Sequence, residues 1–137
     1  MINNKTEYSW PANFPEGIPA LEETVPAEGW VYRLARTFPP TQVDFLPHRE
    51  EKPNYPYNKD QIPLSYGVSV WTKLDKIKQV ARNYPYPEQY GNWHTVCGSL
   101  CPELGVIPKE LTMSGHVTLW VQEGAKPHEY ISHKVEE

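Results

Sequence analysis

Arg33 and Ser69 are the residues whose types and surroundings most favour chemistry in this chain. Arg33 stands within the stretch WVYRLAR, residues 30–36, and Ser69 stands within YGVSVW, residues 66–71. An arginine inside a strand is costly to bury unless it is paired or binds an anion, and its planar guanidinium group suits phosphate. Two interpretations stay open. Arg33 binds an anionic ligand, or it lies on a solvated sheet face or meets a carboxylate such as that of Asp44.

His94, Cys97 and Cys101 form a second group of reactive side chains. On a helix they would share one face, but the β-branched residues and glycine of TVCGS favour a strand, in which His94 faces away from both cysteines. The spacing matches no paired zinc motif, so we predict no metal site; two buried thiols and a surface imidazole are the alternative. On a strand the two cysteines lie about 13 Å apart, which is too far for a disulfide.

Other catalytic motifs are weakly represented in the sequence. A cysteine–histidine nucleophile pair that uses His94, His116 or His128 stays open, because a sequence does not show which residues are neighbours in space. The chain contains no G-x-S-x-G, no P-loop and no G-x-G-x-x-G motif. The sequence therefore gives no support to an α/β-hydrolase or to a glycine-rich nucleotide-binding turn.

Composition limits the classes of partner. The 137 residues carry a net charge of −4 and contain no run rich in lysine or arginine, so we predict no nucleic-acid partner. No apolar run approaches the roughly 20 residues that span a bilayer, and the first ten residues lack the apolar segment of a secretory signal. We therefore predict no membrane partner. With unpaired cysteines, these features favour a cytoplasmic location.

The elements that must position these residues follow from proline spacing and hydrophobic periodicity. Residues 1–29 are acidic and rich in proline, and we predict an extended arm that docks through Trp10, Phe14 and Leu21. Residues 30–137 are predicted to form a single domain. The stretch 38–63 contains many prolines and is predicted to be a long loop, with a turn at residues 41–45 because Thr-x-x-Asp resembles a helix start.

The predicted fold class is α+β, with a compact, mostly antiparallel sheet of four to six short strands and one main helix. The helix is expected over residues 72–83, with Thr72 as its cap and with one apolar face. Alternation places Val68 and Val70 on the core side, so Ser69 and Trp71 share the opposite face, where we expect a site. The expected strands cover residues 30–36, 64–71, 93–100, 106–107, 116–122 and 130–135.

Three segments carry a resemblance that covers about residues 30–120. VYRLARTFPPTQVDF, YGVSVWTKLDKIKQVAR and GHVTLWV resemble, in this order, a set of small uncharacterised bacterial proteins. More distantly, the order of an early arginine strand, a serine strand that runs into a helix and a later glutamate is similar to the ADP-ribosyltransferase fold.

The resemblance implies a catalytic set of Arg33, Ser69 and Glu123. In those roles Arg33 binds the pyrophosphate of NAD, Ser69 braces the nicotinamide ribose, and Glu123 stabilises a developing oxocarbenium cation or orients the ribose. No cofactor is predicted, and NAD enters as a substrate. The set implied to bind substrate is Tyr32, Tyr66, Trp71, Thr72 and His116.

Two classes of function therefore stay open. One is an ADP-ribosyltransferase-like protein that binds NAD or an ADP-ribose derivative. The other is a non-enzymatic protein-interaction module, with a toxin-neutralising or assembly role. Such a module uses the proline-rich arm, the long loop and exposed tyrosine and tryptophan side chains as its surface, since interfaces favour these residue types. The predicted partner is accordingly a small molecule or a protein.

Overall fold

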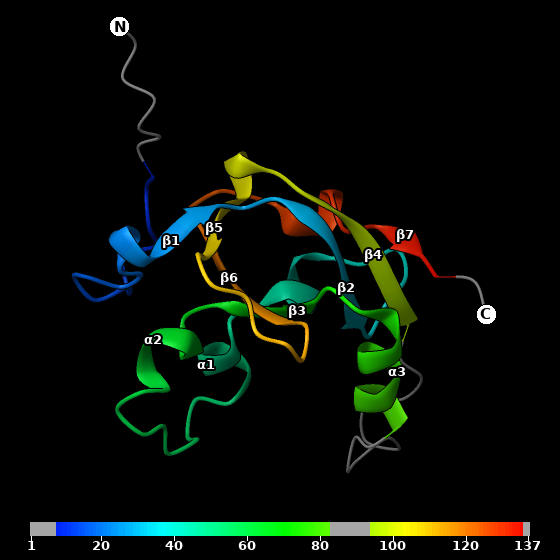
Figure 1. Cartoon of the computed structure of the whole chain (residues 1–137), viewed down its shortest axis with the longest axis horizontal. Coiled ribbons are helices and arrows are strands. Elements are labelled where there is room, and N and C mark those ends of the chain that lie inside the picture. Colours follow the sequence, from blue (N-terminus) through cyan, green and yellow to red (C-terminus); the bar gives the residue numbers. More distant parts are fainter. Residues whose placement is uncertain (1–7, 83–93, 136–137) are drawn as a thin grey trace, which may run out of the picture.

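A seven-stranded antiparallel sheet dominates the computed structural model, which describes residues 8–82 and 94–135 (Figure 1). The α+β class is confirmed, but the sheet has more strands than the four to six expected, and the described residues form three helices rather than one main helix. The strand order is β1-β5-β6-β3-β2-β4-β7. The strands are β1 (Thr24–Pro26), β2 (Gly29–Ala35), β3 (Val68–Trp71), β4 (His94–Leu100), β5 (Gly105–Pro108), β6 (His116–Val121) and β7 (His133–Lys134).

Strand β1 is the strand that the sequence prediction missed, and it belongs to the proline-rich arm. It pairs with β5 from Thr24↔Pro108 to Pro26↔Val106 at the edge of the sheet. An edge strand tolerates proline, because one side of the strand needs no partner for its N–H groups. Further back in the arm, Trp10 and Phe14 pack against a buried cluster that contains Tyr66, whereas Leu21 is exposed. Two of the three expected docking residues therefore contact the domain.

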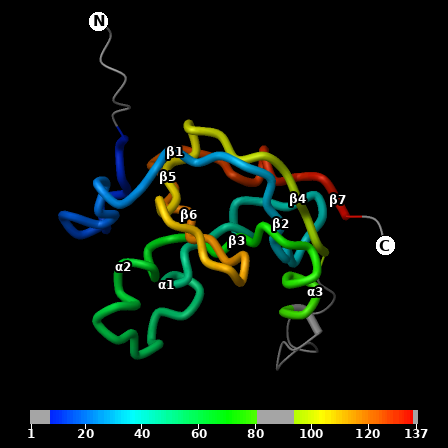
Figure 2. Tube along the Cα trace, viewed as in Figure 1, coloured from blue at the N-terminus to red at the C-terminus, as the bar shows by residue number. Residues whose placement is uncertain are grey.

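The expected helix is α3 (Leu74–Arg82), which begins two residues later than predicted; residue 83 lies outside the described residues. Thr72 instead donates its hydroxyl and its backbone N–H to the carbonyl of Gly115. The long loop contains the 3-10 turn η2 (Gln42–Phe45) and the one-turn helices α1 (His48–Glu51) and α2 (Ile62–Ser65). Figure 2 shows the chain leaving the broad loop of α1 and α2, passing through β3 and entering α3. No helix among the described residues is long and apolar enough to cross a membrane.

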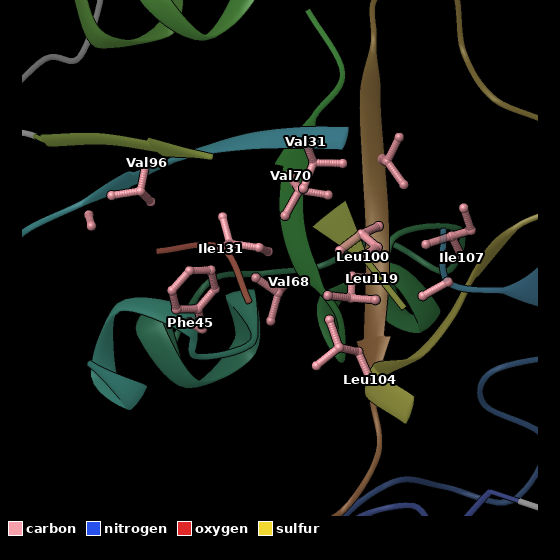
Figure 3. Close-up of a cluster of buried hydrophobic side chains, with 13 residues drawn as sticks. Val31, Phe45, Val68, Val70, Val96, Leu100, Leu104, Ile107, Leu119 and Ile131 are labelled. Carbon is pink, nitrogen blue, oxygen red and sulfur yellow. The ribbon is translucent and has the colours of Figure 1, made fainter. Parts of the chain in front are cut away.

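The core lies on one face of the sheet and explains the alternation of β3. Val68 and Val70 are buried, while Ser69 and Trp71 are half-buried on the opposite side. Side chains from the central strands meet Phe45 at the end of η2 and Ile131 near the C-terminus (Figure 3). The predicted division of β3 into a valine face and a serine–tryptophan face is therefore confirmed.

Candidate functional site

Arg33 occupies a gap between the two central strands. The register between β2 and β3 consists of the single pair Tyr32↔Trp71, although each strand is fully paired on its other side. Beyond that pair, the Arg33 side chain takes the place of backbone pairing, because Nη1 donates to the Ser69 carbonyl at 2.6 Å. Its Nε donates to the Asp44 carbonyl at 2.8 Å. One guanidinium group thus joins β2, β3 and η2.

The positively charged guanidinium group of Arg33 is largely buried. Its side chain is 12% exposed, and Nη2 lies 3.8 Å from a carboxylate oxygen of Glu51, on α1. The guanidinium carbon also lies 5.4 Å from the centre of the Phe45 ring. Burial lowers the pKa of Arg33, and the nearby carboxylates of Glu51 and Asp44 partly oppose this effect. An arginine stays protonated in proteins, so Arg33 draws the carboxylate of α1 toward the sheet.

Ser69 and His116 form a hydrogen-bonded pair on the half-buried face. The register Ser69↔Thr118 and Trp71↔His116 brings the serine and the histidine onto neighbouring positions of β3 and β6. His116 Nε2 lies 2.9 Å from Ser69 Oγ. The Trp71 ring meets the imidazole edge-on, with ring centres 4.9 Å apart. Strand pairing and the indole ring therefore fix the position of His116 against the serine hydroxyl.

A second histidine approaches the same place from the loop. His48, the first residue of α1, pairs through Nδ1 with the Tyr57 hydroxyl, and the Tyr55 ring meets it edge-on. Burial lowers the pKa of His48, and the positive charge of Lys52 lowers it further. Burial also lowers the pKa of His116, with a further contribution from His48. Both imidazoles are therefore mostly neutral at neutral pH, since an unperturbed histidine titrates near about 6.5.

Two hollows meet at these side chains and form one cleft. The first has a volume of about 260 Å³ and extends toward α3. The second has a volume of about 350 Å³ and extends toward α2. The residues that line both hollows are His48, Lys52, Ser69 and His116. Trp71, Ile77 and Val80 line the first hollow, and Tyr55, Tyr57 and Leu64 line the second. The cleft thus has a polar, cationic junction with aromatic or apolar walls on each side.

The structure brings together four of the eight residues predicted for the catalytic and substrate-binding sets. Arg33, Ser69, Trp71 and His116 all line the first hollow. Glu123 does not: it is exposed beyond the end of β6, its N–H donates to the Ser9 carbonyl, and it lines two other hollows. The predicted catalytic set of arginine, serine and glutamate therefore does not converge, because β6 carries its C-terminal end away from the gap between β2 and β3.

Three residues of the predicted substrate-binding set also lie outside the cleft walls. Tyr32 is paired with Trp71 across the strands. Tyr66 is buried under the edge of Phe14. Thr72 is bound to the Gly115 carbonyl. Packing against the arm therefore occupies the Tyr66 side chain, and the β3–β6 connection occupies that of Thr72. Tyr32 lines neither hollow.

Sequence reasoning missed the side chains that α1 and its loop contribute. His48, Glu51 and Lys52 stand in the long proline-rich stretch, which has no periodicity from which to predict their direction. The only indication was the length of the loop, since long loops inside compact domains often carry function.

The residues described give no support to a metal centre. No group of three or more histidine, cysteine or acidic side chains within residues 8–82 and 94–135 is placed to hold a metal ion. Cys97 is buried and Cys101 half-buried, and both are free thiols. Burial raises the pKa of each thiol. Both cysteines are therefore poor nucleophiles at neutral pH, since the thiolate is the reactive form.

Comparisons with known proteins give no further guide to the function. No family model matches the chain, and neither the curated proteins nor the solved structures include a significant match. The function must therefore be argued from the cleft itself.

The Asp44 carboxylate lines the first hollow and stabilises the turn η2. A substitution at this position measures that contribution to stability. Its carboxylate accepts hydrogen bonds from the Arg36 N–H, the Thr41 N–H and the Thr37 hydroxyl. Burial raises the pKa of Asp44, but these hydrogen bonds outweigh burial and lower the pKa overall. The charged carboxylate therefore stabilises the fold above the unfolded-state pKa of about 3.9, and this contribution is lost as the pH falls through the lower folded-state pKa.

We expect Asp44→Asn to lower the free energy of unfolding by about 1.5–3 kcal/mol at neutral pH, the range for hydrogen bonds to a charged group. Urea unfolding at a series of pH values measures this difference, which should shrink below about pH 3.9. The exposed Asp60→Asn is the matched control. A difference that stayed constant across this range would show that the charge of Asp44 is not the source of the stabilisation.

Proposed function

We propose that this chain binds a nucleotide-type ligand, an NAD-like dinucleotide or an ADP-ribose derivative, in the cleft between α1, α2 and α3. The observation that carries this proposal is the junction of the two hollows, where the exposed Lys52 stands between the Trp71 wall and the Tyr55–Tyr57 wall. A lysine ammonium group is a common phosphate ligand, and aromatic rings offer flat faces to a base or to nicotinamide.

The size and charge of the cleft agree with such a ligand. Ligand pockets commonly measure about 300–1,000 Å³, and each hollow is near the lower end of that range. Arg33, Arg36 and Lys52 line the first hollow together with the carboxylates of Asp44 and Glu51. The Asp44 carboxylate is bound by neighbouring N–H and hydroxyl groups. A ligand phosphate at the junction therefore meets a net cationic wall.

The carboxylate available to contact the ribose of a ligand in this cleft is that of Glu51, not Glu123. Glu51 lines the first hollow beside Ser69 and His116, and its side chain is 25% exposed. In this proposal Glu51 takes the part of orienting the ribose of the bound ligand, which the resemblance gives to glutamate. Arg33 serves to position Glu51, since it holds the loop against β3.

Reversing the charge of Lys52, the cation at the junction, tests the proposal. We expect NAD and ADP-ribose to raise the melting temperature of the wild type, and Lys52→Glu to raise the Kd at least about 10-fold in calorimetric titration, a loss of about 1.4 kcal/mol. The physical reason is that the variant removes a cation and places a carboxylate beside the ligand phosphate. Lys59→Glu is the matched control, because Lys59 is exposed in the same loop and lines neither hollow.

Binding that is absent in the wild type, or equal in the two variants, would contradict the nucleotide site. The second candidate, a non-enzymatic protein-interaction module, would then be favoured. It is supported by the exposure of Tyr55, Ile62 and Leu64, which are 46%, 36% and 46% exposed on the loop and α2. In that case the partner is a protein with an apolar contact surface.

A further inference from the structure

We infer that Ser69 is a nucleophile and that His116 takes its proton, so that the cleft cleaves a phosphate anhydride or an activated phosphate ester held at the junction. This inference rests on the proposed function, because the substrate phosphate is the group that Lys52 would bind. It goes further in naming the bond that reacts. The electrophile placed beside the serine is phosphorus, rather than the ribose carbon of an ADP-ribosyl transfer.

The position of the Ser69 hydroxyl is the first support for this inference. Ser69 Oγ lies 2.9 Å from His116 Nε2, within the distance over which a histidine acts as a base toward a serine. Ser69 lines both hollows, so its hydroxyl stands at their junction rather than at one end. The serine backbone is fixed on each side, because β3 pairs with β6 and the Ser69 carbonyl accepts a hydrogen bond from Arg33.

The protonation state of His116 is the second support for this inference. A base must be neutral, and with the imidazole proton on Nδ1, Nε2 accepts the hydrogen bond from the serine. The half-buried ring is held edge-on by Trp71, which fixes its angle toward Ser69. Burial and the nearby His48 lower the pKa of His116, so the neutral form prevails at neutral pH.

The location of Lys52 is the third support, because it selects phosphorus as the electrophile. Lys52 lines the same two hollows as Ser69 and His116. A phosphate bound to its ammonium group therefore lies beside the serine hydroxyl, whereas the base and sugar of a nucleotide extend into the hollows on either side. An ammonium group also stabilises the negative charge that increases on phosphate oxygens in the transition state.

The reaction then proceeds in two balanced steps. The oxygen of Ser69 attacks phosphorus, an Oγ–P bond forms, the anhydride P–O bond breaks, and the serine proton moves to His116 Nε2. The leaving group departs as a phosphate monoester anion. After His116 has lost this proton to solvent, it takes a proton from a water molecule whose oxygen attacks phosphorus, and it gives that proton to Ser69 Oγ as the Oγ–P bond breaks.

A fluorophosphonate probe tests the nucleophile without requiring nucleotide binding. We expect wild-type protein to gain one adduct by intact mass, with the label on Ser69 by peptide mapping. Fluoride is the leaving group, so the probe needs no acid. We expect Ser69→Ala to gain no adduct. We expect His116→Gln to react about 100-fold more slowly, which is the lower end of the usual rate contribution of a general base. Ser65→Ala is the matched control, since Ser65 lines the second hollow but donates its hydroxyl to the Ile62 carbonyl.

A measurement on the wild type keeps the test independent of variant folding. The labelling rate should fall as the pH drops through the pKa of His116 and that imidazole becomes protonated. The charged and titratable groups that line the two hollows with it are His48, Lys52, Glu51, Asp44, Arg33, Arg36, Tyr55 and Tyr57, and Lys73 lies beyond the adjacent turn. His48→Gln should raise the midpoint of this pH dependence, because His48 gains a proton as the pH falls and its positive charge then lowers the pKa of His116. Labelling that is absent, falls on another residue, or is independent of His116 would overturn the inference.

Analysis of the reaction products tests which bond of the nucleotide is broken. Wild-type protein incubated with ADP-ribose should release AMP, and Ser69→Ala should not. Release of nicotinamide from NAD without AMP would overturn the attack on phosphorus. If calorimetry shows that the nucleotides bind normally while neither adduct nor AMP forms, this inference fails and the proposed function stands. If Ser69 is labelled but no nucleotide binds, the proposed function fails, and with it the phosphate-anhydride substrate.

Discussion

Replacing Arg33 by leucine should lower the free energy of unfolding by about 2–5 kcal/mol, chiefly because two carbonyl groups lose the donor that satisfies them. The Ser69 and Asp44 carbonyls each lose a donor, and an unsatisfied buried polar group costs about 1–3 kcal/mol. Glu51 loses its counter-charge as well. Urea unfolding followed by circular dichroism measures the loss, with Lys59→Leu as the exposed control for removal of a cation.

Arg33→Lys distinguishes the geometry of the guanidinium group from its charge. One ammonium group does not reproduce a planar fork that donates in two directions, so the lysine variant should lose a substantial part of the stability that the leucine variant loses. Hydrogen exchange should also become faster in η2 and α1, because Arg33 contacts both of them from the sheet. A loss below about 1 kcal/mol in Arg33→Leu would show that water satisfies both carbonyls and that the gap needs no bridge.

Replacing Gly98 by alanine should lower the free energy of unfolding by about 3 kcal/mol or more, at or above the upper end of the range for an overpacked core. A Cβ atom on Gly98 would lie 2.0 Å from the Tyr130 carbonyl oxygen and 2.7 Å from the Ile131 Cα. These are backbone atoms, so no rotation of a side chain relieves the contact. The segment must move outward, and with it Ile131, which is fully buried in the core.

Ser99→Ala is the matched control for Gly98→Ala, because Ser99 is the exposed neighbour on the same strand. Thermal and urea unfolding of the two variants measure the difference, and near-ultraviolet circular dichroism reports whether aromatic packing is retained. An equal stability of the two variants would show that the segment after residue 127 adjusts at little cost. The core would then depend less on Ile131 than its burial indicates.

The cleft places two histidines and a lysine at one junction, and this arrangement connects both proposals. A ligand phosphate at Lys52 explains why nucleotides should bind, and the neighbouring Ser69–His116 pair explains what could happen to that phosphate. Lys52→Glu tests the first point, and Ser69→Ala tests the second. The two variants therefore separate recognition from reaction.

Local sequence determined several features of this protein by itself. The alternation in β3 fixed the valines inward and Ser69 and Trp71 outward, because successive side chains of a strand point to opposite faces. The apolar spacing of α3 and the Thr-x-x-Asp start of η2 likewise depend on neighbours a few residues apart. The Ser–Trp face was identified as the place of a site for this reason.

Only the tertiary structure decided what faces Ser69. His116 reaches it through the register of β3 with β6, and His48, Glu51 and Lys52 reach the cleft because a proline-rich loop folds over the sheet. The same assembly places Glu123 elsewhere and adds β1 to the edge. Periodicity reports the face on which a residue lies within its own element. It carries no information on which distant element covers that face, since that choice depends on packing and hydrogen bonds between residues far apart in the chain.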